Sequence, residues 1–139
     1  MRRRARKLFY INSNEGPLMA GFSGDAGFCT QVMRWLKGEI ERPNPLDFLK
    51  IDDLTRQCAL VVREDRSVWL LGSDLVYTRV YDEFCATGAG QEIAYGALEM
   101  GASAQRAVRV VEQRSDYAGF GVNWCSFDRP GHINLEGDE

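Results

Sequence analysis

The sequence of 139 residues lacks the features that mark membrane, secreted and nucleic-acid-binding proteins. No apolar run approaches the ~20 residues that a membrane-spanning helix needs. The basic start, residues 1–7, leads into an apolar patch at residues 8–11 that is too short for the core of a signal peptide. The 17 basic and 20 acidic residues nearly balance, which gives no reason to expect nucleic acid. We expect a cytoplasmic protein with no membrane partner and no nucleic-acid partner.

Histidine and cysteine are also scarce. The one histidine is His132, and the four cysteines, Cys29, Cys58, Cys85 and Cys125, lie far apart without a C-x-x-C pair. A structural zinc site needs such ligands in closely spaced groups, so we expect no metal site and no cofactor. Each cysteine lies in an apolar context, which is typical of a buried, reduced thiol.

Short apolar runs separated by turn residues predict strands, most of them joined as hairpins. The length indicates a single domain over residues 1–139, with a polar tail at 128–139. Residues 12–17 have turn chemistry and are expected to form a rather long hairpin loop. The predicted strands are 8–11, 18–22, 58–63, 68–71, 75–80 and 121–127.

One helix is expected early in the chain, capped by Ser23 or Asp25 and ending near Lys37. Its predicted buried side chains are Phe28, Val32, Trp35 and Leu36. Residues 39–53 contain two prolines and little periodicity, so we expect a connector with one turn around residues 46–49.

The most informative stretch, residues 84–121, predicts a strand end, a glycine turn and two helices. Gly88 and Gly90 allow a tight turn, Gly101 ends the first helix, and Ser103 caps the second. With mostly antiparallel strands, these helices predict a layered α+β domain. The side chains expected on the apolar sides of the two helices are Ile93, Ala94, Ala97 and Leu98, followed by Ala104, Ala107, Val108, Val110 and Val111.

Several short motifs, taken in order, resemble the proteasome β-subunit family of N-terminal nucleophile hydrolases, including its bacterial and phage-type relatives. The resemblance spans residues 6–127. The motifs are RKLF at residues 6–9, AGFSGDA at 20–26, GAG at 88–90, YGAL at 95–98, GASA at 101–104 and DYAG at 116–119.

The resemblance implies a four-layer αββα sandwich, in which helices cover two antiparallel sheets. It also implies a ring-shaped homo-oligomer that hydrolyses polypeptide substrates in a chamber, as a threonine-type peptidase. An unfoldase ATPase is the implied partner that feeds the chamber.

Three residues occupy positions that carry the reaction in this family. Lys7 matches the lysine that tunes the protonation of the nucleophile, because a nearby cation favours a deprotonated group. Gly21 matches the glycine whose backbone N–H stabilises the oxyanion. Asp116 matches the acidic residue that supports the site from its loop.

Other positions depart from the family pattern. Ala89 and Gly119 stand where the family usually has serines, so two supporting hydroxyls are lost. The family nucleophile is the first residue of the mature chain, about thirty residues before this lysine, yet none of the residues before Lys7 is Thr, Ser or Cys. We expect the chain to lack the first two strands and the nucleophile, and to be inactive alone.

Each of these residues also has a purely structural interpretation. Lys7 fits a lysine at a strand end that extends to water, and Gly21 fits a packing glycine within a strand. Asp116 fits a turn residue, and Asp25 fits a helix cap better than a catalytic group. The alternative function is therefore a non-catalytic assembly or interaction protein with the same fold.

Overall fold

The structure is a computed structural model that describes residues 7–24, 26–48, 58–88, 90–114, 122–124, 127, 128, 131 and 133–136. The chain forms two compact units, one made of Lys7–Tyr81 and the other containing the helices and strands after Asp82. Within the described ranges, no helix combines the length and the apolar character that crossing a membrane requires.

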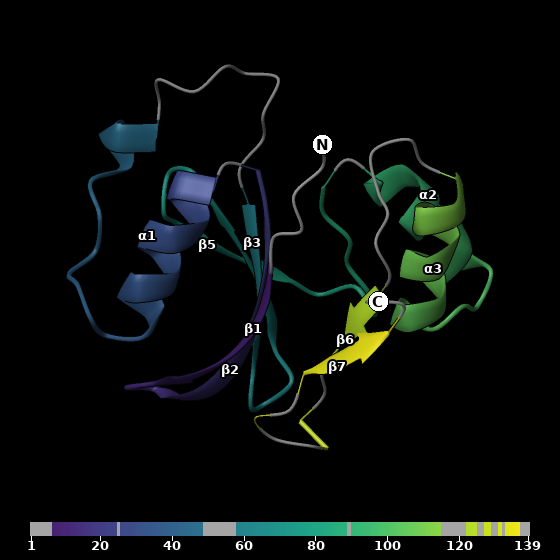
Figure 1. Cartoon of the computed structure of the whole chain (residues 1–139), viewed down its shortest axis with the longest axis horizontal. Helices are drawn as coiled ribbons and strands as arrows, with labels where there is room; N and C mark the ends of the chain where they lie inside the picture. Colours follow the sequence, from purple (N-terminus) through teal and green to yellow (C-terminus); the bar gives the residue numbers. More distant parts are fainter. Residues whose placement is uncertain are drawn as a thin grey trace. The chain divides into compact units, whose positions relative to one another are not determined.

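The first unit is a five-stranded antiparallel sheet with one helix (Figure 1). The strands follow each other across the sheet in chain order, and α1 (Ala26–Leu36) lies between the second and third in the sequence. A short 3-10 helix, η1 (Pro45–Phe48), confirms the turn predicted in the connector. The strands are β1 (Leu8–Ser13), β2 (Gly16–Ser23), β3 (Cys58–Arg63), β4 (Val68–Gly72) and β5 (Tyr77–Val80).

The hairpin between β1 and β2 is tighter than predicted. Residues expected in a long loop continue both strands, and only Asn14 and Glu15 form the turn. Gly16 has a φ of 110°, and the Ser13 hydroxyl donates a hydrogen bond of 2.6 Å to the Gly16 carbonyl. A glycine and a short hydroxyl side chain therefore close the turn where the sequence had suggested a longer loop.

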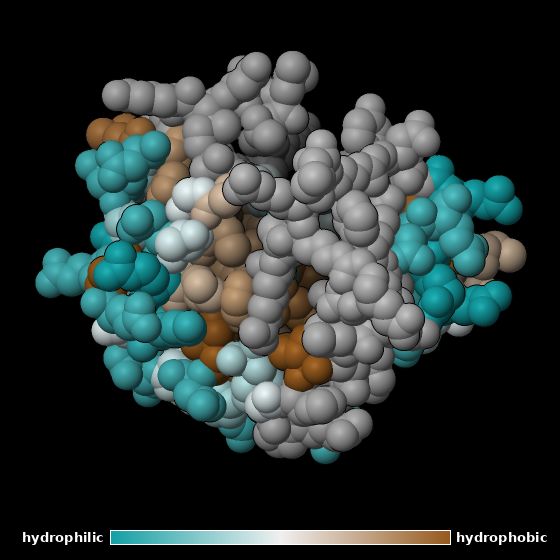
Figure 2. Space-filling model, in the orientation of Figure 1, coloured by the Kyte–Doolittle hydropathy of each residue, from teal (hydrophilic) through white to brown (hydrophobic). Residues whose placement is uncertain are grey.

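One face of the sheet packs on α1. Phe28, Val32 and Leu36 recur at helical spacing and are buried, as predicted. Phe28 also contacts Phe48 of η1 edge to face, with ring centroids 5.3 Å apart. The outer side of α1, at the left of Figure 2, is mostly hydrophilic, as expected for an amphipathic helix. The strand residues in the same core are Ile11, Leu18, Ala20, Phe22, Ala59, Val61 and Leu71.

The other face of the sheet is also mainly apolar. Alternation along the paired strands places there the side chains of Leu8, Tyr10, Met19, Leu60, Val62, Val68, Leu70 and Val80. A sheet with two apolar faces fits the sequence of β3, in which an apolar run continues from Cys58 to Val62.

The second unit contains α2 (Gln91–Glu99), α3 (Ala104–Arg114), β6 (Val122–Trp124) and β7 (Asn134–Glu136). The two helices pack together around Ala94, Ala107 and Val111. Two predictions at their junction are confirmed. Gly101 has a φ of 95° and follows the end of α2, and the Ser103 hydroxyl accepts a hydrogen bond of 3.2 Å from the backbone N–H of Arg106.

Three predictions for this unit are wrong. Residues 84–87 form no strand, and Val108 is 46% exposed because Ala107 and Val111 occupy the buried side of α3. The polar tail, for which no strand was predicted, contains β7, which pairs antiparallel with β6. The mixed α+β class with an antiparallel sheet is confirmed, while the four-layer arrangement and the single domain stay predictions.

Candidate functional site

The sheet register brings together two of the three predicted site residues. Leu8 lies opposite Gly21, and the backbone N–H of Phe22 donates a hydrogen bond of 2.8 Å to the carbonyl of Lys7. Lys7 and Gly21 therefore lie beside each other at the start of the β1–β2 hairpin, although they are distant in sequence. The third residue, Asp116, lies outside the described residues, as do Ala89 and Gly119.

The backbone direction at Gly21 follows from this register. In an antiparallel ladder, successive residues turn their N–H and C=O groups to opposite sides. Because Phe22 donates toward β1, the N–H of Gly21 faces β3, where Leu60 is its partner in register. The predicted oxyanion donor therefore points into the sheet, and its role stays a prediction.

Packing alone does not explain a glycine at this position. Among the described residues, a Cβ atom built on Gly21 meets only the Leu8 side chain, at 4.0 Å, which is an ordinary contact. Gly21 is also absent from the glycines with positive φ. The described surroundings would therefore accept alanine here, so the structural interpretation of Gly21 as a packing glycine gains no support.

Lys7 is exposed, and its charge acts on Cys29 in α1. Burial raises the pKa of the Cys29 thiol, and the ammonium group of Lys7 lowers it by a smaller amount. The thiol is therefore protonated at neutral pH. Since the thiolate is the nucleophilic form, Cys29 is a poor candidate for a nucleophile.

The glycine turn before α2 serves packing. Gly88 has a φ of 104°, and its carbonyl accepts a hydrogen bond of 3.1 Å from the N–H of Gln91. A Cβ atom on Gly90 would lie 2.2 Å from the Cγ1 atom of Val111 in α3. The predicted tight turn is confirmed at both glycines, and the close approach of α3 explains why residue 90 has no side chain.

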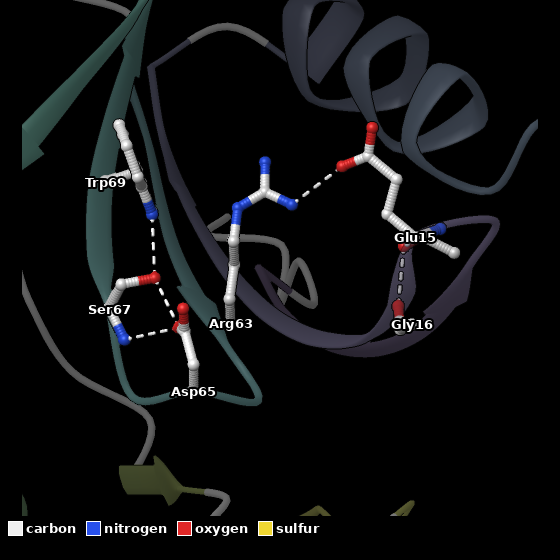
Figure 3. Close-up of polar contacts among 7 residues, drawn as sticks. Glu15, Gly16, Arg63, Asp65, Ser67 and Trp69 are labelled. Atoms are coloured by element: carbon white, nitrogen blue, oxygen red, sulfur yellow. Dashed lines mark hydrogen bonds and ion pairs between the residues drawn. The ribbon is translucent and has the colours of Figure 1, made fainter.

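A polar cluster on the first unit was not predicted (Figure 3). In the β3–β4 turn, the Asp65 carboxylate accepts hydrogen bonds from the hydroxyl and the backbone N–H of Ser67, at 2.5 and 2.9 Å. The indole N–H of Trp69 donates to the same hydroxyl at 2.9 Å. The hydrogen bonds from Ser67, and more weakly the charges of Arg79 and Arg63, lower the pKa of Asp65.

Beside this turn, Arg63 forms an ion pair of 2.9 Å with Glu15 of the neighbouring hairpin turn (Figure 3). The two side chains line an open depression of about 440 Å³ together with Glu64 and Asp65. The run of polar residues from Arg63 to Ser67 was the available signal in the sequence, but by itself it indicates only a turn. Opposite charges that pair with each other make this cluster a structural feature of the hairpin.

The thiols described by the structure are half-buried rather than buried, at Cys29, Cys58 and Cys85. Cys85 accepts a hydrogen bond of 3.5 Å from the hydroxyl of Tyr95. His132 and Cys125 lie outside the described residues. Among the residues with described positions, no three His, Cys, Asp or Glu side chains are grouped as metal ligands.

Comparison of the chain with models of known protein families gives no match, and comparison with curated proteins gives none either.

Proposed function

We propose that this chain is a subunit of a proteasome-like assembly, related to the threonine-type peptidases and organised as a four-layer αββα sandwich. The observation that carries the proposal is the position of Lys7 and Gly21 at the same end of the β1–β2 hairpin, where the Lys7 carbonyl is hydrogen-bonded to Phe22, the residue after Gly21. The proposed reaction requires a cation and a backbone N–H close to one reacting atom. The β1–β2 hairpin places Lys7, the proposed cation, near Gly21, although the N–H of Gly21 itself faces Leu60 of β3.

The two apolar faces of the first sheet support the proposed layers. One face packs on α1, and the opposite face carries Leu8, Met19, Leu60, Val62 and Leu70. An apolar sheet face is stable only when another layer covers it. A second sheet over this face is the arrangement that the proposed sandwich needs.

The proposed assembly is a closed ring with a central chamber for polypeptide substrates, served by an unfoldase ATPase. Electron microscopy and light scattering of the purified chain test the ring. Particles with rotational symmetry are the expected result, and a monomer at high micromolar concentration contradicts the assembly.

We expect no hydrolysis of fluorogenic peptides by the printed chain alone. No Thr, Ser or Cys precedes Lys7 in it, and the Cys29 thiol is protonated because its pKa is raised. Turnover by the purified chain that Lys7→Ala abolishes would contradict this expectation, because the printed chain would then contain a nucleophile.

The direction of the Gly21 amide favours a second candidate, a non-catalytic assembly protein of the same fold. An N–H that faces Leu60 in the sheet is not directed at a substrate. Mixing the chain with homologous subunits that carry an N-terminal threonine separates the two candidates. If Lys7→Ala lowers the peptidase activity of the mixture while Lys7→Arg retains it, the catalytic role holds; if neither variant changes it, the assembly role is the better description.

A further inference from the structure

The strand β5 has a free edge in the part of the chain that the structure describes. It pairs with β4 on one side, and it is the last strand of the sheet. Within β5, Thr78 and Arg79 are exposed while Tyr77 and Val80 are half-buried. The flanking residues Val76 and Tyr81 are 55% and 85% exposed. Unpaired backbone groups on such an edge are a template for another strand.

The register determines which backbone groups point outward. The N–H of Arg63 donates to the carbonyl of Ser67, so Ser67 faces β3, and by alternation Val68 and Leu70 face β5. Their partners in β5 are Val80 and Thr78. The backbone groups of Tyr77 and Arg79 therefore point away from the sheet.

We propose that β5 pairs with β5 of a second copy of this chain, antiparallel and with the two-fold axis at Thr78. This register lets Tyr77 of each copy exchange backbone hydrogen bonds with Arg79 of the other, and both residues have outward-pointing groups. On the same sheet face, the guanidinium of one copy meets the aromatic ring of the other, a favourable pair. The backbone hydrogen bonds of this pairing need no group outside β5.

The opposite sheet face is also self-complementary in this register. Val76 lies across from Val80 of the second copy, and Thr78 lies across from Thr78. Such β-branched and Thr–Thr pairs stabilise antiparallel strands. The pairing would also cover Val76, one of the exposed large apolar side chains.

Charge on an edge strand normally discourages pairing, but the one charge on β5 lies over its own sheet. The Arg79 guanidinium carbon is 5.5 Å from the ring centroid of Trp69 and 5.1 Å from that of Tyr81. Asp65, whose pKa the same arginine lowers, partly balances it. This local balance favours a second copy of the chain over an acidic peptide as the occupant.

The contact covers only residues 76–80, because Leu75 has a φ of 58° and leaves the extended conformation. A contact this short gives a weak dimer, so we expect association in the micromolar to millimolar range. Sedimentation velocity over that range measures it.

Arg79→Pro removes an outward N–H without removing a bond to β4, and it should weaken dimerisation at least about tenfold. The matched control, Arg79→Ala, keeps the N–H and should lose less affinity.

A cross-linking experiment tests the register directly. Thr78 would lie opposite Thr78 as a non-hydrogen-bonded pair, with Cα atoms about 4.5 Å apart, within reach of a disulfide. Thr78→Cys should therefore form a covalent dimer under mild oxidation, above the background of the unmodified chain. Arg79→Cys is the control, since its diagonal partner would lie about 7–8 Å away.

Circular dichroism of each variant confirms that the sheet is retained. A chain that stays monomeric, or a dimer that Thr78→Cys fails to link, overturns the proposal. The pair is a two-fold contact that requires neither a ring nor peptidase activity. A chain that associates without a Thr78→Cys cross-link therefore overturns this pairing alone, whereas a strictly monomeric chain contradicts the proposed assembly as well.

Discussion

Substitution of Gly90 by alanine should destabilise the helical pair. The added Cβ would lie 2.2 Å from the Cγ1 atom of Val111 and 3.4 Å from its Cβ atom, so α2 and α3 must separate or distort. Val111 is 8% exposed and has little room to move. Overpacking of this kind costs about 1–3 kcal/mol of the free energy of unfolding.

Shortening the Val111 side chain should remove the destabilisation that Gly90→Ala causes. The backbone at Gly90, with φ −95° and ψ 12°, is compatible with alanine. In a Val111→Ala background, Gly90→Ala should therefore be neutral, or stabilise by up to about 1 kcal/mol through the unfolded chain. The coupling between the two substitutions should be about 1–3 kcal/mol and favourable to the double variant.

Urea unfolding followed by far-ultraviolet circular dichroism measures these differences. Gly96→Ala is the matched control, because Gly96 lies within α2 and, apart from the backbone of that helix and its chain neighbours, no atom of the described residues stands within 4 Å of the added Cβ. It should stabilise the helix by about 0.5–1 kcal/mol. If Gly90→Ala stabilises the protein as Gly96→Ala does, the close approach of α2 and α3 at this point is refuted.

Three further predictions concern the first unit. Phe28→Ala should lower the free energy of unfolding by about 3–5 kcal/mol, because Phe28 is fully buried against the sheet and η1; urea unfolding measures the loss, and a value below about 1 kcal/mol contradicts the packing. The pKa of Asp65 is lowered in the folded protein, so its carboxylate stabilises the fold at pH values above the pKa of the unfolded chain, and this stabilisation is lost as the pH falls through the folded-state pKa. Asp65→Asn should therefore flatten that part of the curve of unfolding free energy against pH. An unchanged curve counts against the role of Asp65. Lys7→Ala should slow alkylation of Cys29 by iodoacetamide, since loss of the cation raises the pKa of the thiol further; mass spectrometry follows the rate, and faster labelling would show that the charge does not act as described.

Local chemistry was enough to predict most of the elements. The strand at residues 58–63, the end of α2 before Gly101 and the helix cap at Ser103 each depend on nearby residues, and all three are confirmed. The helix α1 follows from the spacing of Phe28 and Val32 in the same way.

Features that depend on distant partners were missed. The strand β7 has only three residues, and its pairing with β6 gives it its conformation. The predicted apolar side of α3 was wider than the side that is buried. Val108 matches the helical pattern, but the contact with α2 is narrow and leaves Val108 exposed.

The candidate site was predictable only in part. The sequence placed Lys7 and Gly21 in neighbouring strands through a hairpin, and their adjacency follows from that hairpin. The direction of the Gly21 amide depends on the register with β3, which no local pattern specifies. The cluster of Arg63, Asp65 and Trp69 arises across two strands, and so it could not be recognised from a turn alone.

The strand order of the first unit has a consequence for how the protein folds. Three of its four strand pairs are hairpins with short turns, so their contacts close quickly and at a small entropic cost. The pairing of β2 with β3 instead requires closure over α1 and the connector that follows it. We expect this step to limit the folding rate, so that shortening the connector accelerates folding more than strengthening any hairpin does.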